Sequence, residues 1–362
     1  MTTHFFLGAN SGDGFQSLFA EFCQPDEFED LMILKGGSGC GKSTFMKRLG
    51  RELEERGEIV EYLHCSGDPD SLDGVWFPQL RVGAVDGTSP HVIEPRYPAA
   101  VDRYINLGQF YHIEAAKESR KEVIHHSDRC KAAYARAYRA MNAARQMEDS
   151  LHELVAEGLD CGRLLRRTEG IVRRELHGRG EGGWDKRRFL GSVTYQGGVW
   201  RFDTVATLCP RVYQLQDSYG LAAPMLAALR QAAHHRGYAC IQCPDPEHTG
   251  RLHHLLIPDL GLAFVTSREG MEYSGSSYRR IRLDAMVPAA IYRNYKTRIR
   301  FLERMAGLLR QEAVEALQEA HAAHDSLELV YRPHVDFDGL EELTGRELER
   351  LLSVRRKPTD LA

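Results

Sequence analysis

The N-terminal part of the chain places a short apolar run, a glycine-rich loop and a segment with helical spacing one after another. Leu31-Met32-Ile33-Leu34 has the length and composition of a buried strand. Beyond the loop, apolar side chains at positions 45, 46, 49 and 53 fall on one face of a helix. A second apolar run, residues 82–85, ends at Asp86. This order of elements predicts an α/β unit.

Long segments without proline follow. Residues 113–157 are rich in Ala, Glu, Lys and Arg, and residues 295–330 are similar apart from Gly307. Both segments are predicted to be helical, because these residue types have high helix propensities. Shorter helices are expected at 162–176 and 339–354.

The same pattern occurs twice along the chain. Phe6-Leu7-Gly8-Ala9 recurs as Phe189-Leu190-Gly191-Ser192, and Phe77-Pro78-Gln79-Leu80 recurs as Ile257-Pro258-Asp259-Leu260. Further pairs, in the same order, are Arg56-Gly57 with Arg236-Gly237, Val85 with Val265, Ile105-Asn106-Leu107 with Ile281-Arg282-Leu283, and Asp149-Ser150-Leu151 with Asp325-Ser326-Leu327. Matches in a fixed order with a slowly drifting offset indicate a duplicated unit.

We therefore predict an α/β fold with two tandem domains, each built on a parallel sheet and extended by long helices. The first domain is expected to span residues 1–182, with its helical extension at 113–176. The second is expected to span residues 183–362, with its extension at 288–354. The boundary falls in the glycine-rich segment 178–183, and the two domains are expected to pack as an intramolecular pseudo-dimer.

The loop after the first apolar run carries candidate chemistry. The pattern G-x-x-x-x-G-K-[ST] is matched at each fixed position by Gly36-Gly37-Ser38-Gly39-Cys40-Gly41-Lys42-Ser43, and Thr44 follows. Glycines let the backbone amides turn towards an anion, and the helix N-terminus adds the positive end of its dipole. We expect the loop to bind a nucleoside triphosphate, with Lys42 at the β- and γ-phosphates and the Ser43 hydroxyl at Mg²⁺.

A P-loop also needs an acid for the magnesium shell. Asp86 is the candidate, because it ends an apolar run that reads as a strand. It precedes Gly87, so it could instead cap a turn. Weaker competitors lie in an earlier loop that contains proline and glycine: Asp68, Asp70 and Asp73. Lys42 and Asp86 are thus the predicted catalytic residues, and Ser43 and Asp86 the predicted metal ligands.

The corresponding loop of the second repeat lacks this chemistry. It runs from Gln216 to Pro224 as Gln-Asp-Ser-Tyr-Gly-Leu-Ala-Ala-Pro. An offset of 180 residues places Ala222 and Ala223 opposite the lysine and the serine of the first loop. An offset of 181 residues places Ala223 and Pro224 there instead. Neither register supplies a lysine or a hydroxyl group.

Two further positions of the second repeat support the same interpretation. Thr266 stands opposite Asp86, so the candidate acid is missing. Asp217 would add negative charge where a phosphate should lie, which is repulsive. We therefore expect one nucleotide site per chain and a catalytically inactive second repeat.

Composition and charge narrow the function classes. The chain is 43% hydrophobic and 27% charged, as is ordinary for a globular protein. The formal net charge of −4 gives no basic field for nucleic acid or an anionic membrane. Apolar runs long enough to span a bilayer and a signal-peptide pattern are both lacking, so we expect no membrane insertion and a cytoplasmic protein. The eight cysteines are then expected to be mostly reduced.

Two other clusters have competing interpretations. Cys240 and Cys243, with His248, His253 and His254, resemble a zinc knuckle in spacing. A single CxxC on a predicted buried strand favours buried free cysteines instead. Residues 163–188 are rich in arginine, but interleaved acidic residues favour a solvated helical face over a nucleic-acid surface.

The unit containing Gly36–Thr44 is similar to the P-loop NTPases in general. More narrowly, the chain resembles a poorly characterised bacterial family of tandem-duplicated P-loop proteins labelled ATPase or nucleotide-kinase-like. The resemblance covers nearly the whole chain and rests on residues 6–9, 36–44, 77–80, 85–91 and 186–191. It implies nucleotide binding in P-loop NTPase-like domains. Family members tend to have a working P-loop in both halves, and this chain departs from that pattern in its second half.

The residues leave three functions open. In an ATPase, Lys42 and Mg²⁺ would neutralise the γ-phosphate charge while a water attacks in line. In a kinase for a nucleotide or another small molecule, the long helices would form a lid over an acceptor. A non-enzymatic nucleotide sensor or scaffold is the third. Candidate acceptor-binding residues follow Asp86 or shortly precede it: Arg81, His91, Arg96 and Arg103.

Two motifs that are absent from the sequence bear on which nucleotide base is expected. An LSGGQ-like signature is absent from the sequence, which argues against an ABC transporter subunit. An N/T-K-x-D motif is absent as well, which argues against a Ras-like GTPase. ATP with Mg²⁺ is therefore the expected cofactor, whereas the acceptor and any protein partner stay open.

Overall fold

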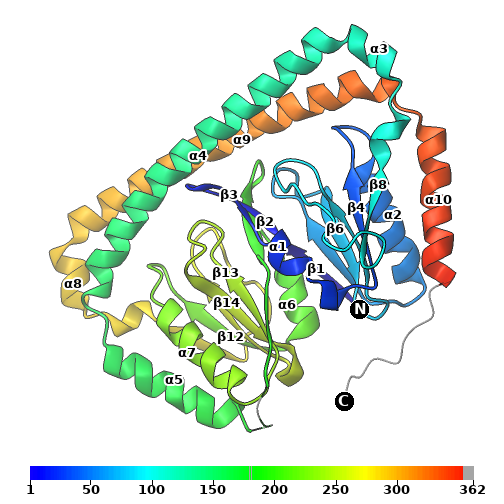
Figure 1. Cartoon of the computed structure of the whole chain (residues 1–362). Coiled ribbons are helices and arrows are strands. Elements are labelled where there is room, and N and C mark those ends of the chain that lie inside the picture. Colours follow the sequence, from blue (N-terminus) through cyan, green and yellow to red (C-terminus); the bar gives the residue numbers. More distant parts are fainter. Residues whose placement is uncertain (179, 181, 354–362) are drawn as a thin grey trace. The chain divides into compact units, whose positions relative to one another are not determined.

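The computed structural model describes residues 1–178, 180 and 182–353 (Figure 1). Arg179 and Glu181, which belong to the predicted linker, lie outside the described residues, as do residues 354–362. The chain divides into two compact units. Unit 1 comprises residues 1–8, 17–136 and 315 onward, and unit 2 comprises residues 9–16 and 137–314.

The described part of unit 1 contains a six-stranded sheet in the order β1-β5-β6-β7-β4-β8. Its strands are β1 (Thr2–Phe6), β4 (Asp30–Lys35), β5 (Val60–His64), β6 (Leu72–Phe77), β7 (Val82–Asp86) and β8 (Asp102–Asn106). β1 is parallel to β5, and β7 and β8 are parallel to β4, whereas β6 runs antiparallel to both of its neighbours. The four predicted strand residues 31–34 are all buried in β4, as expected for a strand covered on both faces.

Helix α2 (Lys42–Glu55) follows the glycine-rich loop and packs against β5, β6 and β7. Its buried residues include Phe45, Met46, Leu49 and Leu53, which is the face that the sequence predicted. These side chains join those of the sheet in the core of unit 1. The order of strand, loop and helix is therefore as expected.

Unit 2 has the same topology in its described residues. Its six-stranded sheet has the order β9-β13-β14-β15-β12-β16. The strands are β9 (Asp185–Arg187), β12 (Arg211–Gln216), β13 (Cys240–Pro244), β14 (Leu252–Ile257), β15 (Leu262–Ser267) and β16 (Arg279–Arg282). Each strand occupies the same place and has the same direction as its counterpart in the sheet of unit 1. Strand β14, like β6, runs antiparallel to both of its neighbours. Helix α7 (Ala223–His234) covers β13 and β14.

The helices of the two predicted extensions lie close to their predicted positions. They are α3 (Ile113–Glu118), α4 (Arg120–Ala156), α5 (Cys161–Glu175), α8 (Ala289–Asn294), α9 (Lys296–Tyr331) and α10 (Phe337–Ser353). Shorter elements are the helices α1 (Phe19–Phe22) and α6 (Phe202–Leu208) and the strands β2 (Gly8–Ser11), β3 (Gly14–Ser17), β10 (Gly191–Thr194) and β11 (Gly197–Trp200). The prediction of α/β units with mostly parallel sheets and long helices is confirmed. No described helix is long and apolar enough to cross a membrane.

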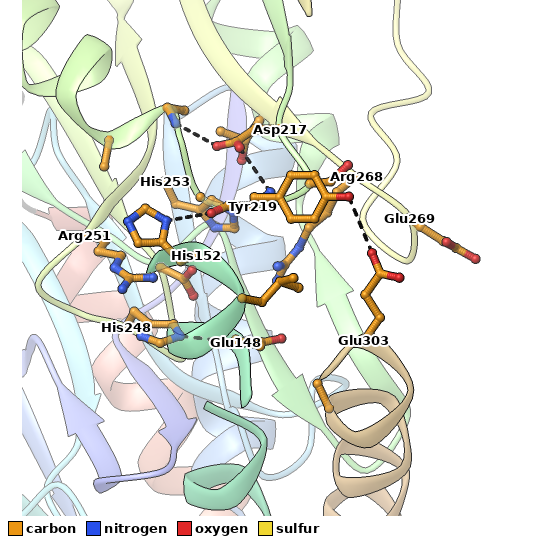
Figure 2. Close-up of a pocket in the computed structure, with 18 of the residues that line it drawn as sticks. Glu148, His152, Asp217, Tyr219, His248, Arg251, His253, Arg268, Glu269 and Glu303 are labelled. Carbon is orange, nitrogen blue, oxygen red and sulfur yellow. Dashed lines mark hydrogen bonds and ion pairs between the residues drawn. The ribbon is translucent and has the colours of Figure 1, made fainter. Parts of the chain in front are cut away.

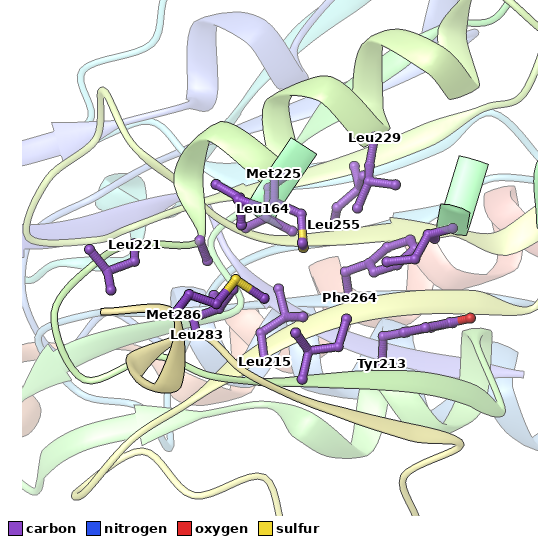
Figure 3. Packing of buried hydrophobic residues seen from close by; sticks show 14 of the residues in the cluster. Leu164, Tyr213, Leu215, Leu221, Met225, Leu229, Leu255, Phe264, Leu283 and Met286 are labelled. Atoms are coloured by element: carbon purple, nitrogen blue, oxygen red, sulfur yellow. The ribbon is translucent and has the colours of Figure 1, made fainter. Parts of the chain in front are cut away.

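Each compact unit contains a helix from the other sequence repeat. Leu340, Leu348 and Leu351 of α10 join the core of unit 1, although α10 lies in the second half of the sequence. Leu164 and Ile171 of α5 join the core of unit 2, although α5 lies in the first half (Figure 3). The compact units and the sequence repeats therefore divide the chain differently.

Candidate functional site

The glycine-rich loop of unit 1 leads directly from β4 into α2. Gly39 and Gly41 both have left-handed backbone conformations, with φ of +74° and +83°. A side chain at Gly41 would also place its Cβ 2.5 Å from the Leu340 Cδ2 atom of α10. These two positions therefore require glycine, because other residues rarely adopt this conformation.

Lys42 is the first residue of α2, and its ammonium group turns back to the loop. Its Nζ atom donates hydrogen bonds to the carbonyl oxygens of Gly36, at 2.9 Å, and Gly37, at 3.0 Å. It also lies 3.7 Å from the Asp86 Oδ2 atom. The side chains of Lys42 and Asp86 are 14% and 13% exposed, so this ion pair is only partly screened by water. The two predicted catalytic residues thus lie together.

The carboxylate of Asp86 caps a turn with one oxygen and faces Lys42 with the other. Its Oδ1 atom accepts hydrogen bonds from the Thr88 backbone N–H, at 2.8 Å, and the Thr88 hydroxyl, at 2.6 Å. This is the local turn expected for an Asp-Gly pair. Its other oxygen faces Lys42. The turn therefore orients the carboxylate towards the loop.

The Ser43 hydroxyl lies next to the start of β6. Its Oγ atom accepts a hydrogen bond from the Leu72 backbone N–H at 3.0 Å. The next residue, Asp73, is buried in β6, not in a loop as the sequence suggested. Asp and Gly have low strand propensity, but pairing with β5 and β7 decides the structure here. Asp68 instead accepts hydrogen bonds from its own turn, and Asp70 is exposed.

Asp73 and Asp86 are neighbours across two antiparallel strands. The register of β6 and β7 pairs Gly74 with Val85, so the next step outward brings Asp73 opposite Asp86. His91 Nε2 lies 3.4 Å from Asp73 Oδ2, and both side chains are buried. Burial lowers the pKa of His91, but the charges of Asp73 and Asp86 outweigh this effect and raise it overall. Asp73 and Asp86 are therefore adjacent on neighbouring strands, and Asp86 faces the loop lysine.

The remaining loop residues shape the backbone. Cys40 is buried, and burial raises the pKa of its thiol despite the opposing charge of Lys42. The thiol therefore has little thiolate character and acts in packing. Tyr111 donates a hydrogen bond to the Ser38 carbonyl oxygen at 2.7 Å. Thr44 is exposed on the first turn of α2.

The structure selects one of the two registers for the second loop. α7 begins at Ala223 as α2 begins at Lys42, an offset of 181 residues. Gly220 has a φ of +75° and lies 181 residues after Gly39, whose φ is +74°. Ala223 is therefore the counterpart of Lys42, and Pro224 follows at the position of the serine.

Sheet pairing fixes the counterpart of the acid in the same way. β4 pairs Leu34 with Asp86, and β12 pairs Leu215 with Thr266. Leu215 lies 181 residues after Leu34, so Thr266 occupies the position of Asp86. The lysine, the serine and the acid are thus all replaced in unit 2.

Asp217 is the residue whose role the sequence did not reveal. It is buried, and its carboxylate accepts hydrogen bonds from the backbone N–H groups of Leu221 and Ala222, both at 2.8 Å. A third, longer bond of 3.3 Å comes from the Tyr219 N–H. Burial raises the pKa of Asp217, and these amides oppose the rise. The loop therefore holds an internal carboxylate at the N-terminus of α7, where we had expected only repulsion of a phosphate.

Unit 2 has a pocket of about 320 Å³ beside this loop (Figure 2). His253, which lines it, is the second residue of β14 as Asp73 is the second residue of β6. The pocket's basic side chains are paired within the unit: Arg251 contacts Asp149 at 2.7 Å, and Arg310 contacts Glu148. The pocket thus offers a phosphate little unpaired positive charge from these two arginines.

The other two predicted clusters belong to unit 2. Cys240 and Cys243 are buried on β13, and burial raises the pKa of both thiols. Only the first part of the arginine-rich segment 163–188 lies in α5, where Arg173 lies 3.9 Å from Glu169 on the exposed side. Among the described residues, no three His, Cys, Asp or Glu side chains are grouped to hold a metal ion.

Comparisons of the chain with protein-family models, with curated proteins and with solved structures found no match. The functional interpretation therefore depends on the geometry of the loop and its neighbours. In unit 1 that geometry joins a glycine loop, a lysine, a hydroxyl group and two carboxylates at the carboxyl end of β4 and β7.

Proposed function

We propose that the chain is an ATPase that binds ATP and Mg²⁺ at the loop 36–43 of unit 1. The observation that carries the proposal is the position of Lys42, held between the loop carbonyls and Asp86 at the start of α2. A lysine at this point places a positive charge beside backbone amides that can receive an anion. The phosphates of ATP would replace the carbonyl oxygens as partners of the ammonium group.

The residues present fit a magnesium ion. Ser43 and Asp86 supply oxygen ligands, which magnesium prefers, and the Oδ2 atom of Asp73 is buried without a hydrogen bond from any described residue. Magnesium commonly takes its other ligands from phosphate and water, so a cage of three protein carboxylates is not required. When bound, the ion would neutralise charge that develops on the γ-phosphate.

Hydrolysis is favoured over transfer to an acceptor because three of the four candidate acceptor-binding residues, namely Arg81, His91 and Arg103, already have side-chain partners. Arg103 donates to both oxygens of Asp30 and to both oxygens of Glu347. His91 faces Asp73, and Arg81 lies 3.3 Å from Glu29. These groups hold unit 1 together, so an acceptor would have to displace ion pairs to use them.

Phosphate release tests the proposal. The full chain is incubated with Mg·ATP, with and without a pool of nucleosides and nucleoside monophosphates, beside Lys42→Ala. Lys47→Ala is the matched control, because it removes an exposed lysine from the same helix. We expect release without an acceptor, unchanged in Lys47→Ala and reduced by about two orders of magnitude in Lys42→Ala.

Two other outcomes would replace the ATPase. ATP consumption that requires an acceptor would make the chain a kinase, and the productive acceptor would identify its substrate. Binding of ATP without turnover in either condition would make the chain a nucleotide sensor. Failure of the wild type to bind ATP at all would reject the nucleotide site itself.

A further inference from the structure

Asp73 is a buried acid whose carboxylate is only partly satisfied within unit 1. The residue is 4% exposed, and its Oδ2 atom lacks a hydrogen bond from any described residue. His91 Nε2 is 3.4 Å from the same oxygen, which is an ion-pair distance. Buried carboxylates normally accept several hydrogen bonds, and exceptions often mark a site for an ion or a reaction.

The position of Asp73 in the sheet brings it to the nucleotide loop. β6 runs antiparallel to β7, so β6 begins at the edge of the sheet where β4 and β7 end. The Leu72 N–H, which immediately precedes Asp73, donates to the Ser43 hydroxyl. Asp86 lies opposite Asp73 on β7 by the strand register. The hydroxyl and both carboxylates are therefore positioned by one pair of strands.

The second repeat provides an internal comparison. Strands β6 and β14 occupy equivalent places in the two sheets, and His253 of β14 occupies the position of Asp73. Thr266 occupies the position of Asp86, and Pro224 that of Ser43. The unit that lacks the loop lysine and hydroxyl thus also lacks both acids. This joint replacement is expected if the two acids serve the same ion.

We infer that Asp73 acts with Asp86 in holding the magnesium of the bound nucleotide, and that His91 is a positioning residue for Asp73. The inference rests on the proposed function and adds a second carboxylate to it. Two carboxylates and a hydroxyl are a common protein contribution to a magnesium site that is completed by phosphate and water. A histidine beside one carboxylate would fix its orientation, as outer-shell partners of metal ligands do.

Binding of Mn²⁺, followed by the electron paramagnetic resonance signal of the free ion, tests Asp73 separately from activity. The full chain is titrated with Mn²⁺ in the presence of a non-hydrolysable ATP analogue. Asp73→Asn keeps the shape of the side chain, and Asp70→Asn is the control, because Asp70 is exposed in the preceding loop. We expect Asp73→Asn to weaken Mn²⁺ binding by roughly tenfold to a hundredfold, and Asp70→Asn to leave it unchanged.

The outcomes separate the inference from the proposed function. Wild-type Mn²⁺ affinity in Asp73→Asn would overturn the inference, including the case in which turnover falls, since Asp73 would then act on the reaction and not on the metal. Absence of nucleotide binding in the wild type would reject both. Analogue binding without metal should be similar in Asp73→Asn and the wild type, which also shows that the variant is folded.

A double-mutant cycle tests the role of His91. His91→Ala should weaken Mn²⁺ binding severalfold, and His91→Gln, which keeps a donor, should restore part of the loss. If His91 acts through Asp73, adding His91→Ala to Asp73→Asn should produce little further loss. Fully additive losses would show that His91 does not position this carboxylate.

Discussion

The loops after β4 and β12 connect equivalent elements but differ in their polar groups and in the backbone before the helix, where Gly41 is left-handed and its counterpart Ala222 is helical. Both connect a buried strand to a helix, and both have a left-handed glycine at the equivalent point, Gly39 or Gly220. In unit 1 the lysine at the helix start faces loop carbonyls and an acid. In unit 2 the carboxylate of Asp217 accepts hydrogen bonds from backbone N–H groups just before the helix. The loop of unit 2 thus holds an anion that belongs to the chain itself.

This difference explains why the second loop can keep its form without a ligand. Amide groups at a helix N-terminus need acceptors, and a carboxylate of the same chain can supply them. The amides of Leu221 and Ala222 already donate to Asp217, so a phosphate could not use them. The charge of the Asp217 carboxylate would also repel a phosphate. Retention of the loop in unit 2 therefore does not require an anion from outside the chain.

The largest effect is expected from removal of the proposed magnesium ligand Ser43 in the first loop. Ser43→Ala removes the hydroxyl that we assign to magnesium, so ATP turnover should fall by about two orders of magnitude. Thr44→Ala is the control, because it removes an adjacent but exposed hydroxyl. Turnover at several magnesium concentrations measures both variants. Equal losses in the two variants would remove Ser43 from the proposed site.

A smaller effect is expected when the internal anion is removed from unit 2. Asp217→Gly leaves the amides of Leu221 and Ala222 without their acceptor and should lower the free energy of unfolding by about 2 kcal/mol. Glu269→Gln, which alters an exposed acid of the same pocket, should have little effect. Thermal unfolding of both variants measures the difference.

Added phosphate sharpens the same test. If Asp217 stands in for an anion, millimolar phosphate should raise the unfolding temperature of Asp217→Gly more than that of the wild type. Equal responses of the two proteins would show that the loop of unit 2 does not accept an anion when the carboxylate is removed.

The left-handed glycines should respond alike in the two loops. Gly39→Ala and Gly220→Ala each place a Cβ in a left-handed conformation, so each should lower the free energy of unfolding by about 1–2 kcal/mol. Gly307→Ala provides a control of opposite sign, because Gly307 lies within α9 with open space around it. Denaturant unfolding measures all three. A large difference between the two loop variants would contradict the equivalence of Gly39 and Gly220.

The smallest expected effect concerns acid stability of unit 2. Burial alone would raise the pKa of Glu175, but the Tyr213 hydroxyl and the charges of Arg174 and Arg211 lower it below its ordinary value of 4.5. A carboxyl group whose pKa is lowered by folding stabilises the protein above its unfolded pKa, and this stability is lost as the pH falls. Glu175→Gln should therefore remove about 1 kcal/mol at neutral pH and little in strong acid. A constant difference across pH 2–7 would contradict this.

The sequence was sufficient to predict the elements that depend on local pattern. The apolar run 31–34, the loop glycines and the helical face of α2 are each encoded in consecutive residues. The repeat was also visible, because equivalent positions such as Phe77 and Ile257 end equivalent strands, β6 and β14. The lysine and its acid could be paired because strand ends of a parallel sheet share an edge.

Features that depend on long-range packing could not be predicted from the sequence. The periodicity of α5 and α10 shows an apolar face but does not say which sheet that face covers. Asp73 was assigned to a loop because proline and glycine lie close to it in the sequence, and only pairing with β7 places it opposite Asp86. Asp217 was interpreted by its charge alone, whereas its partners depend on the turn at Gly220.

Isothermal titration calorimetry with a non-hydrolysable ATP analogue and Mg²⁺ tests the central claim most directly. The claim is that each chain binds one nucleotide, at the loop of unit 1. We expect one site per chain in the wild type and in Glu269→Gln, and none in Lys42→Ala. Two sites in the wild type, or a site that persists in Lys42→Ala, would contradict the assignment.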